Sequence, residues 1–299
     1  MILITGATGF IGQNLLKALL GKKIPIRCLV RDKKKIKENS GLEIVEGDLR
    51  DKERLFEATK NVDIVIHLAA VIKSLNSQDF TDVNVKGTRN LTEACLKNKV
   101  KEIIYVSSLD ACLTRTNFYG ESKALAERVI VESSINYVIL RPAFVYGKES
   151  EDIVTLKRLV QRLPFIPVIG NGKAMLQPIY VEDVCDIIVR FVENGVKNKI
   201  YYLAGEERIS VDGFIDKIAS YYLKKVIKVH IPSRVIFFPL RLMSFVIKNP
   251  ALNFDSLKLS NRNKVCDISE IKGQFNVKFL NLEKGIAKAL IKDDACSGK

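Results

Sequence analysis

A glycine-rich run near the start of the chain restricts the possible folds more than any other feature. The run is Thr5-Gly-Ala-Thr-Gly-Phe-Ile-Gly12, and it joins the β-branched stretch Ile2–Thr5 to the amphipathic stretch Ile11–Leu20. Its first glycine permits a tight turn, the second lets a pyrophosphate approach the backbone, and the third lets the helix pack closely on a sheet. Free N–H groups and the helix dipole at such a turn attract phosphates. The run therefore predicts a dinucleotide site where the first strand becomes the first helix.

The first 141 residues alternate short β-branched runs with longer amphipathic stretches, which is the pattern of βαβ units. We expect strands at Ile2–Thr5, Ile26–Val30, Glu43–Glu46, Asp63–Leu68, Ile103–Ser107 and Tyr137–Leu140. We expect helices at Ile11–Leu20, Lys52–Lys60, Asp82–Lys97, Tyr119–Ser133 and Val181–Asn194. The strands are apolar on both faces, as in a parallel sheet that helices cover on both sides. The predicted fold class is α/β, with a doubly wound parallel sheet of the Rossmann type.

The pattern becomes less regular after Arg141-Pro142, because prolines and glycines interrupt the chain between positions 164 and 172. We expect residues 1–145 to form a dinucleotide-binding domain whose core elements return at about 177–205. Residues 146–176 and 206–292 are expected to form a smaller substrate-binding region, and 293–299 a flexible tail. A chain of 299 residues is long enough to bury the core of both parts.

The net charge of +14 makes a polyanionic partner plausible: a nucleotide substrate, a nucleic acid or an anionic membrane face. Many lysines lie in surface-like runs such as Lys33–Lys35, and a compositional bias towards Ile, Asn and Lys explains most of the charge. No nucleic-acid docking motif is recognisable, so we expect no nucleic-acid partner.

The stretch Ile231–Lys248 combines many apolar side chains with a few basic ones. It is too short, and too interrupted by Pro239 and Arg241, to span a bilayer. A basic amphipathic segment of this kind can make a peripheral contact with a membrane. Packing on the substrate-binding region, or a dimer contact, is the interpretation that we favour.

Cysteine spacing and the first residues bear on the cellular compartment. The six cysteines have no C-x-x-C spacing and most lie in apolar patterns, so we expect reduced thiols: Cys28, Cys95, Cys112, Cys185, Cys266 and Cys296. The opening stretch Met1–Thr5 leads directly into the glycine turn and leaves no room for a secretion signal. The sequence therefore favours a cytoplasmic protein.

Histidine is nearly absent, since the chain holds only His67 and His230. A histidine-dependent hydrolase or metal site is therefore not expected, and we predict no metal. His67 ends the fourth predicted strand, where we expect it to pack and to hydrogen-bond the backbone near the cofactor.

A second cluster of candidate residues is Tyr119-Gly-Glu-Ser-Lys123. Tyrosine and lysine at i and i+4 share one helix face and can act on the same bound molecule. Free tyrosine ionises near pH 10, so acid–base work near neutrality requires a shift of about three pKa units, or roughly 4 kcal/mol. A nearby ammonium and a positively charged nicotinamide can supply it. With Ser107 and Ser108 at the end of the preceding strand, the pattern predicts a Ser108, Tyr119 and Lys123 catalytic set.

These motifs resemble those of the extended short-chain dehydrogenase/reductases, the NAD(P)-dependent epimerase/dehydratase family. Further motifs carry the resemblance: Gly47-Asp48-Leu49, His67-Leu68-Ala69-Ala70, Asn84-Val85-Lys86-Gly87-Thr88, Val106-Ser107-Ser108 and Arg141-Pro142. The resemblance covers about residues 1–205 and includes Gln177–Asp183, which is similar to the family's segment that returns from the substrate side to the core.

The resemblance implies a role for each matching residue. Ser108 would hydrogen-bond the substrate oxygen, Tyr119 would exchange its proton, and Lys123 would hold the nicotinamide ribose and lower the tyrosine pKa. Hydride would pass between nicotinamide and a substrate carbonyl or alcohol carbon. The predicted cofactor-binding residues are Gly6, Thr8, Gly9, Phe10, Ile11, Gly12, Arg31, Asp48, Leu49, Leu68, Ala69, Ala70, Asn84, Ser107, Tyr119, Lys123 and Pro142.

Within that set, Asp48 and Leu49 would contact adenine, Ala69 and Ala70 would line the cofactor, and Asn84 would lie behind the active site. Taken singly, Asn84 also fits a helix cap, Asp48 a turn and Ser107 a strand-end hydroxyl. The order of the motifs along the chain favours the family interpretation.

Cofactor choice depends on the end of the second strand, Leu29-Val30-Arg31-Asp32. An acidic residue there binds the ribose 2′-hydroxyl, and a basic one accommodates a 2′-phosphate. Arg31 occupies the position expected for the acid, and Lys33–Lys35 follow. The sequence favours NADP, and the adjacent Asp32 keeps NAD as the alternative.

The chain also departs from the family pattern. Ser108 and Tyr119 are only 11 positions apart, and Leu109–Cys112 replaces the usual V-Y-G without the Asp-Glu pair of sugar dehydratases, which disfavours dehydration.

One branch of the family, which contains complex I accessory-subunit-like proteins, has similar features. They are the short gap between Ser108 and Tyr119 and the stretches Arg141–Gly147 and Val168–Pro178. Members of that branch can bind a nucleotide without known turnover.

We therefore expect an NAD(P)-dependent oxidoreductase or epimerase that acts on a nucleotide-linked sugar or a related carbonyl compound. The alternative is a non-catalytic NADPH-binding accessory or assembly protein. The complete Ser–Tyr–Lys set favours the enzyme. The resemblance also implies a homodimer formed through Asp82–Lys97 and Tyr119–Ser133.

Overall fold

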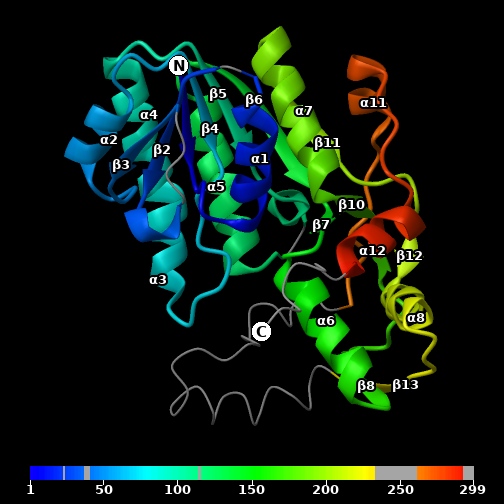
Figure 1. Cartoon of the computed structure of the whole chain (residues 1–299). Helices are drawn as coiled ribbons and strands as arrows, with labels where there is room; N and C mark the ends of the chain where they lie inside the picture. Colours follow the sequence, from blue (N-terminus) through cyan, green and yellow to red (C-terminus); the bar gives the residue numbers. More distant parts are fainter. Residues whose placement is uncertain (23, 37–40, 114–115, 233–260, 292–299) are drawn as a thin grey trace, which may run out of the picture.

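The computed structural model describes residues 1–22, 24–36, 41–113, 116–232 and 261–291. Its centre is a seven-stranded sheet with the order β11-β6-β5-β4-β1-β2-β3, in which every neighbouring pair is parallel (Figure 1). The strands are β1 (Ile2–Thr5), β2 (Ile26–Val30), β3 (Leu42–Glu46), β4 (Ile64–His67), β5 (Glu102–Val106), β6 (Asn136–Pro142) and β11 (Lys199–Leu203). The predicted doubly wound α/β fold is confirmed.

Helices cover both faces of this sheet, as the apolar strands require. The helices α1 (Phe10–Leu20) and α7 (Val181–Asn194) pack together on one face, while α2 (Lys52–Ala58), α4 (Gly87–Lys97) and α5 (Phe118–Val131) lie on the other. Successive side chains of β1 join different core clusters: Ile2 and Ile4 pack with α1 and α7, and Leu3 packs with the opposite set.

The strand order reverses between β1 and β4, which places the glycine-rich run at a switch point of the sheet. Connections from the two strands leave towards opposite faces, so a crevice forms beyond their carboxyl ends, where α/β proteins of this class bind ligands. β5 and β6 end at the same edge, so the segment that follows β5 also reaches this crevice.

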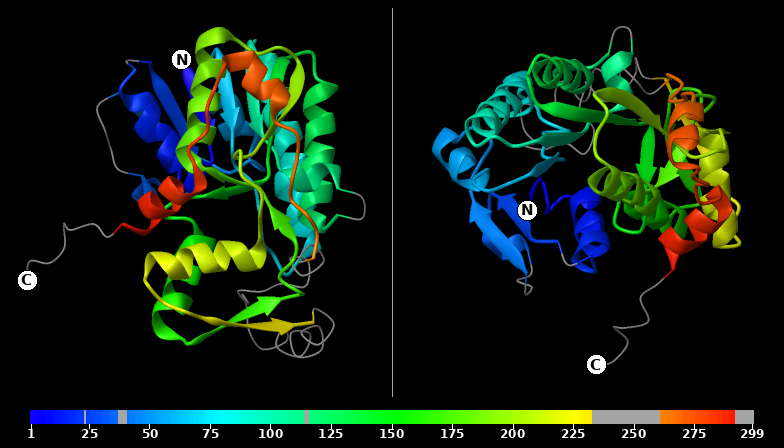
Figure 2. Two further views of the ribbon diagram at one scale, coloured as in Figure 1. Left: turned by 90° about the vertical axis from the view of Figure 1, so that its right-hand side faces the viewer. Right: turned by 90° about the horizontal axis from the view of Figure 1, so that it is seen from above.

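A second group of elements, most of them beyond the carboxyl ends of the strands, is called here the smaller region (147–176, 206–232 and 261–291) (Figure 2). It contains α6 (Glu151–Arg162), α8 (Val211–Tyr221), α12 (Leu282–Leu290) and the strand pairs β8 (Phe165–Ile169) with β13 (Ile227–Ile231) and β9 (Met175–Leu176) with β12 (Ile209–Ser210). The pair β7 (Phe144–Tyr146) and β10 (Pro178–Tyr180) joins it to the sheet, and α11 (Ser269–Phe275) returns beside β11. Its apolar side chains belong to the same core cluster as those of α1 and α7.

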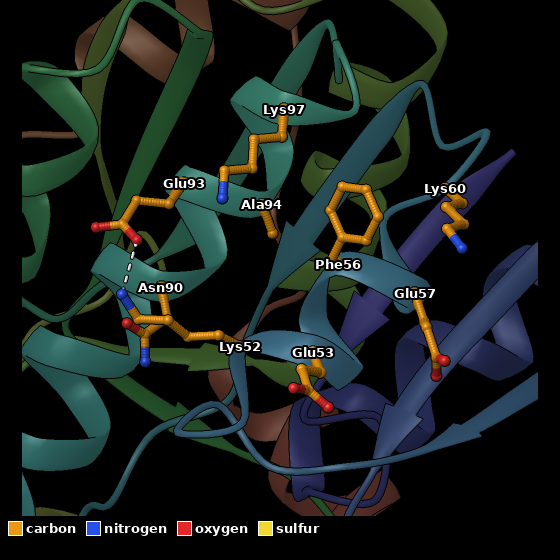
Figure 3. A pocket seen from close by; sticks show the side chains of 9 residues that line it. All are labelled: Lys52, Glu53, Phe56, Glu57, Lys60, Asn90, Glu93, Ala94 and Lys97. Carbon is orange, nitrogen blue, oxygen red and sulfur yellow. Dashed lines mark hydrogen bonds and ion pairs between the residues drawn. The ribbon is translucent and has the colours of Figure 1, made fainter.

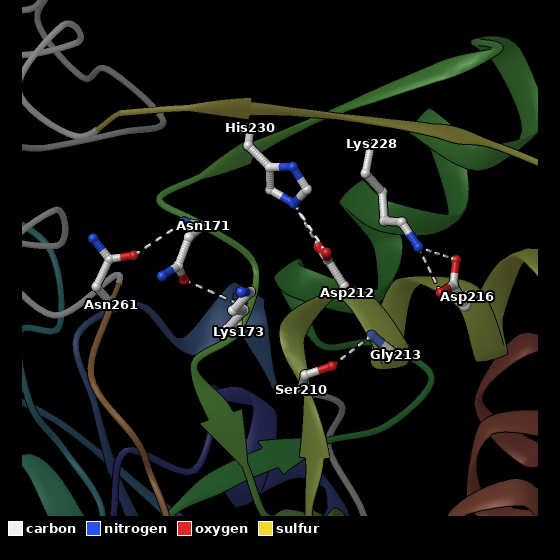
Figure 4. Close-up of polar contacts among 9 residues, drawn as sticks. All are labelled: Asn171, Lys173, Ser210, Asp212, Gly213, Asp216, Lys228, His230 and Asn261. Carbon is white, nitrogen blue, oxygen red and sulfur yellow. Dashed lines mark hydrogen bonds and ion pairs between the residues drawn. The ribbon is translucent and has the colours of Figure 1, made fainter.

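Ion pairs hold β13 on the start of α8. His230 Nε2 lies 2.9 Å from an Asp212 carboxylate oxygen, and Lys228 Nζ lies 2.5 Å from Asp216, one helical turn further on (Figure 4). Because all four groups lie at the surface, these pairs position β13 and contribute little to stability.

The ends of the predicted helices and strands match the observed ones or differ by one or two residues, with one exception. Where the predicted helix Asp82–Lys97 begins, the structure has a π-helical turn, η2 (Phe80–Lys86), which follows a short helix α3 (Ser77–Asp79) and precedes α4. The turn contains Asn84, whose side chain bonds outside the helix, as described below.

Three further predictions concern the chain as a whole. The five described cysteines form no disulfide, whereas Cys296 lies outside the described residues. Most of Ile231–Lys248, and the tail 293–299, also lie outside them. Within the described ranges no helix is long and apolar enough to cross a membrane, and no group of three acidic, histidine or cysteine side chains could hold a metal ion.

Candidate active site

The glycine turn after β1 is built so that only glycine fits two of its positions. Gly6 has a φ of +77°, and a Cβ there would lie 2.6 Å from the Ala69 nitrogen. A Cβ on Gly12 would lie 2.3 Å from the Gly6 carbonyl oxygen. The turn therefore packs directly against the segment after β4. The predicted cofactor-binding residues that follow β1 and those that follow β4 meet at this contact.

The other predicted residues of the turn border this contact. Thr8, Phe10 and Ile11 are half-buried, as are Leu68, Ala69 and Ala70 after β4, so each group keeps surface that a ligand can reach. Backbone N–H groups at the start of α1, together with the glycine cradle, fit a dinucleotide pyrophosphate.

His67 lies beneath this turn and is held by two hydroxyl groups. Its Nδ1 lies 2.7 Å from Thr5 Oγ1 and its Nε2 lies 2.9 Å from Thr88 Oγ1, while the ring stacks on Tyr105. Burial lowers the pKa of His67 to about 3, so the imidazole is neutral near pH 7. The expected packing role is confirmed. The expected backbone hydrogen bonding is wrong, because β1 and α4 place a threonine beside each ring nitrogen.

Asn84 fastens the segment after β4 to α5. Its Oδ1 accepts a 2.7 Å hydrogen bond from the Val71 N–H, and its Nδ2 donates to the Val71 carbonyl and to Ser122 Oγ, both at 2.9 Å. Ser122 immediately precedes Lys123 on α5. Asn84 is therefore a buried link between two parts of the site, and the alternative of a helix cap does not hold.

The three predicted catalytic residues come together beyond β5. Ser108 follows the strand, and Tyr119 and Lys123 lie in the first turns of α5, which Asn117 caps through a 2.8 Å hydrogen bond from the Gly120 N–H. The Ser108 side chain lies close enough to Tyr119 to lower its pKa. Short as it is, the connection from Ser108 to Tyr119 brings these two side chains together.

Lys123 is almost fully buried. Its Nζ donates a 2.8 Å hydrogen bond to the Val106 carbonyl oxygen and lies 4.1 Å from the centre of the Tyr105 ring. Burial lowers the pKa of Lys123 to about 7, and the negative charge of Glu127 opposes that shift. The Tyr105 ring face and the Val106 carbonyl thus replace the water that the ammonium has lost.

The acidity of Tyr119 differs from the sequence expectation. Burial raises the pKa of Tyr119 above its usual value of 10.0, the Asp110 carboxylate raises it further, and the Ser108 hydrogen bond lowers it. The expected lowering of the pKa is therefore absent from this structure, because desolvation of the phenolate outweighs the Ser108 hydrogen bond.

Sequence reasoning did not assign roles to two charged groups behind the site, Glu127 and Arg141. Both are largely buried, and Glu127 also hydrogen-bonds the Ser107 hydroxyl. Glu127 follows Lys123 by four residues and so lies on the same helix face, and this spacing could have placed Glu127 near the site from sequence alone. Its partner Arg141 was named in the sequence analysis only as part of the Arg141-Pro142 motif.

Asp48, which was predicted to contact adenine, is paired with Arg50. Arg50 Nε lies 2.7 Å from Asp48 Oδ1, and Arg50, with a smaller effect from Arg31, lowers the pKa of that carboxyl. Leu49 is buried against Gly87, where an added Cβ would lie 2.7 Å from it.

The end of β2 leaves its basic residue accessible. Asp32 accepts a 3.0 Å hydrogen bond from the Lys34 N–H and so caps the short turn η1 (Lys33–Lys35), while Arg31 is exposed. Pro142 is buried at the end of β6, next to β5 and paired with Leu203.

A surface pocket elsewhere does not belong to this site. It lies between α2 and α4 and is lined by Lys52, Glu53, Phe56, Glu57, Lys60, Asn90, Glu93, Ala94 and Lys97 (Figure 3). No predicted site residue lines it, and the Lys52–Glu93 ion pair at 3.0 Å crosses between its two helices.

Comparison with known proteins matches most of the chain to one family. The model of the family described as NAD dependent epimerase/dehydratase matches residues 2–204. That span runs from the first residue of β1 to just beyond β11, and so includes the whole sheet and the candidate site.

Three relatives carry different descriptions. The chain is 28% identical to NADH dehydrogenase [ubiquinone] 1 alpha subcomplex subunit 9, mitochondrial, of Dictyostelium discoideum, over 93% of this chain and 79% of that protein. It is 31% identical to a ceramide reductase of Caulobacter vibrioides, over 66% of this chain and 62% of that protein. It is 27% identical to a UDP-glucose 4-epimerase of Vibrio cholerae, over 73% of this chain and 74% of that protein.

Proposed function

This chain belongs to the NAD dependent epimerase/dehydratase family, and from that premise we propose that it is an NAD(P)-dependent oxidoreductase or epimerase. The proposed reaction takes place at a carbonyl or alcohol carbon of a nucleotide sugar or a related carbonyl compound. The observation that carries the proposal is that Ser108 lies close enough to Tyr119 to affect its pKa, with buried Lys123 one turn further along α5.

In this proposal each member of the set has one task. Tyr119 exchanges a proton with the substrate oxygen, Ser108 hydrogen-bonds that oxygen, and Lys123 holds the nicotinamide ribose. A bound nicotinamide supplies the acceptor or donor of the hydride that leaves or joins the substrate carbon. Gly6, Gly9 and Gly12 would cradle the pyrophosphate of the cofactor.

We propose NADP as the preferred cofactor, with NAD as the alternative. Arg31 is exposed at the end of β2, while Asp32 is occupied as the cap of η1. Asp48 is likewise occupied by Arg50. With both carboxylates engaged, the positive charge of Arg31 favours a 2′-phosphate over a 2′-hydroxyl.

The deciding experiment incubates the purified protein with NADH or NADPH and a panel of nucleotide sugars and carbonyl compounds. Nicotinamide absorbance and sugar products are followed together. Net consumption of the reduced cofactor identifies a reductase, and product without net consumption identifies an epimerase. Absence of both with every compound would contradict the proposed activity.

The second candidate is a non-catalytic NADPH-binding accessory or assembly protein. It is favoured by the 28% identity to a complex I subunit, which extends over 93% of this chain. Co-purification of a tightly held cofactor that no compound of the panel oxidises or reduces would support it.

We also propose a homodimer formed through α4 and α5. Their outer surfaces expose Leu96, Leu125 and Val131 by 47%, 38% and 43%, which is apolar surface that a helix-to-helix contact would bury. Light scattering of the wild type and of Leu125→Glu tests this: we expect a dimer for the first and a monomer for the second.

A further inference from the structure

The segment 261–266 of the smaller region is fastened to the stretch 171–177 by hydrogen bonds. The Asn261 side chain accepts a 3.2 Å hydrogen bond from the Asn171 N–H (Figure 4), and the Asn263 side chain accepts a 2.9 Å bond from the Met175 N–H. The Lys264 N–H donates a 2.7 Å bond to the Met175 carbonyl oxygen. The backbone of Lys264 is therefore held in the smaller region.

The side chain of Lys264 leaves this segment and reaches the candidate site. Its Nζ lies 3.0 Å from Asp110 Oδ1 and donates a 3.1 Å hydrogen bond to Oδ2. The Asp110 side chain is 7% exposed and that of Lys264 25%. The two residues are 154 positions apart in the chain, so this pair joins the smaller region to the turn that follows β5.

Asp110 in turn contacts the parts of the site that carry the hydroxyls. Its N–H donates a 3.1 Å hydrogen bond to Ser108 Oγ. Its carbonyl oxygen accepts a 2.8 Å bond from Thr116 Oγ1 and lies only 2.6 Å from where a Cβ on Gly120 would stand, so the start of α5 rests on it. A shift of Asp110 would move Ser108 and the helix of Tyr119 together.

We propose that Lys264 is a positioning residue for the reaction: through its ion pair with Asp110, the smaller region holds the Ser108–Tyr119 pair in register with a substrate bound between the two parts of the molecule. The inference rests on the proposed function and extends it to a residue that lies outside the family match of 2–204. Lys264 itself need not contact the substrate.

Charge supports the same conclusion. Burying a carboxylate such as that of Asp110 costs free energy unless a cation lies beside it. The position of segment 261–266 that places the Lys264 ammonium beside Asp110 is therefore favoured. The carboxylate is also close enough to Tyr119 to raise its pKa. The Lys264 ammonium therefore offsets a negative charge beside the proton donor.

The test compares Lys264→Met with Lys264→Arg, which keeps the charge, in steady-state kinetics of the full chain. Lys272→Met is the matched control, because Lys272 forms an exposed ion pair with Glu206 at the same 3.0 Å in the same region. We expect Lys264→Met to lower kcat by about 10-fold to 100-fold with little change in the KM of the cofactor. Lys264→Arg should recover most of the loss, and Lys272→Met should match the wild type.

A double-mutant cycle with Asp110→Asn shows whether the effect runs through Asp110. We expect Lys264→Met to have little further effect once the carboxylate is gone. An equal loss in the Asp110→Asn background, or wild-type kinetics for Lys264→Met, would overturn the proposal.

A readout without turnover separates this proposal from the proposed function. The ¹³Cζ chemical shift of Tyr119, assigned with Tyr119→Phe, reports the surroundings of its hydroxyl, which include Ser108 and Asp110. It should move in Lys264→Met, return in Lys264→Arg and stay unchanged in Lys272→Met. A wild type without turnover would refute the proposed activity, whereas an unchanged Tyr119 signal in Lys264→Met would refute the positioning role.

Discussion

Arg141 and Glu127 form a buried ion pair that joins the helix of the candidate site to the sheet. Arg141 Nη2 lies 2.5 Å from Glu127 Oε2, and Nε lies 3.0 Å from Oε1. Arg141 also donates a 3.0 Å hydrogen bond to the Tyr202 hydroxyl on β11. Because Glu127 follows Tyr119 by two helical turns, the pair fixes the direction in which α5 presents Tyr119 and Lys123.

Removing the charge of Glu127 should therefore destabilise the protein strongly. Glu127→Gln leaves the guanidinium of Arg141 buried without its counter-charge, for which we expect a loss of about 3–5 kcal/mol in the free energy of unfolding. Glu57→Gln is the control, because the Arg54–Glu57 pair is about half exposed and should contribute far less to stability. Urea unfolding of both variants checks the prediction, and equal losses would contradict it.

Tyr119→Phe should abolish turnover and leave cofactor binding nearly intact. The substitution removes only the hydroxyl that exchanges the proton, and the ring of a phenylalanine fills the same half-buried space. We expect kcat to fall by at least about 100-fold, the lower end of what a positioned acid or base contributes. Steady-state kinetics beside a fluorescence titration with NADPH measure the two effects separately. Full activity in this variant would refute the role of Tyr119.

Lys123 should make stability depend on pH in the alkaline range. Its pKa is lowered from 10.5 to about 7 by burial. Between these values the unfolded chain binds a proton that the folded protein does not, so stability rises with pH across the window. The difference in unfolding free energy between the wild type and Lys123→Met should increase by up to about 1.4 kcal/mol per pH unit. Urea titrations from pH 7 to 10 measure this difference. If the unfolding free energies of the two proteins change in parallel with pH, Lys123 keeps its proton in the folded protein and the predicted pKa shift is wrong.

Six of the seven strands of the sheet were predictable because local sequence determines them, whereas β11 (Lys199–Leu203) was not predicted as a strand. β1 and β2 begin and end where their β-branched runs do, and α7 matches its prediction at both ends. Among the predicted helices, the amphipathic pattern failed at the start of Asp82–Lys97, where Asn84 directs its amide to Val71 and Ser122 and the backbone widens into a π-helical turn. No periodicity in the sequence signals such a contact.

The candidate site was predictable only in the part carried by local motifs. The residues of the glycine turn are neighbours in the sequence, and so are Tyr119 and Lys123, so each motif can be recognised within one short stretch of chain. Lys264 meets Asp110 across 154 positions, and a lysine in a lysine-rich chain gives no sign of its partner. Contacts of this kind depend on how the smaller region packs on the sheet.

Gly12→Ala should disrupt the cofactor site, whereas Gly21→Ala should not. The new Cβ at position 12 would meet the Gly6 carbonyl oxygen at 2.3 Å and the Ala7 Cα at 2.7 Å, both of them backbone atoms that cannot move aside cheaply. We expect a stability loss of about 1–3 kcal/mol and weaker NADPH binding. Gly21 has a φ of −75° and no atom near its added Cβ, so alanine there should be neutral or stabilising by about 0.4–1 kcal/mol. Thermal unfolding and NADPH titration of both variants provide the measurement.

Arg31 should determine the preference for NADPH. The side chain is exposed at the end of β2, and a hydrogen bond between a guanidinium and a 2′-phosphate is strengthened by both charges. Arg31→Ser should therefore raise the Kd of NADPH by about 10-fold to 100-fold, as expected for the loss of one charged hydrogen bond, and change that of NADH little. Arg162→Ser, on the exposed end of α6, changes the net charge equally and should leave both constants unaltered. A parallel loss of affinity for NADH and NADPH in Arg31→Ser would instead mean that Arg31 contacts a part common to both cofactors, and the NADP assignment would fall.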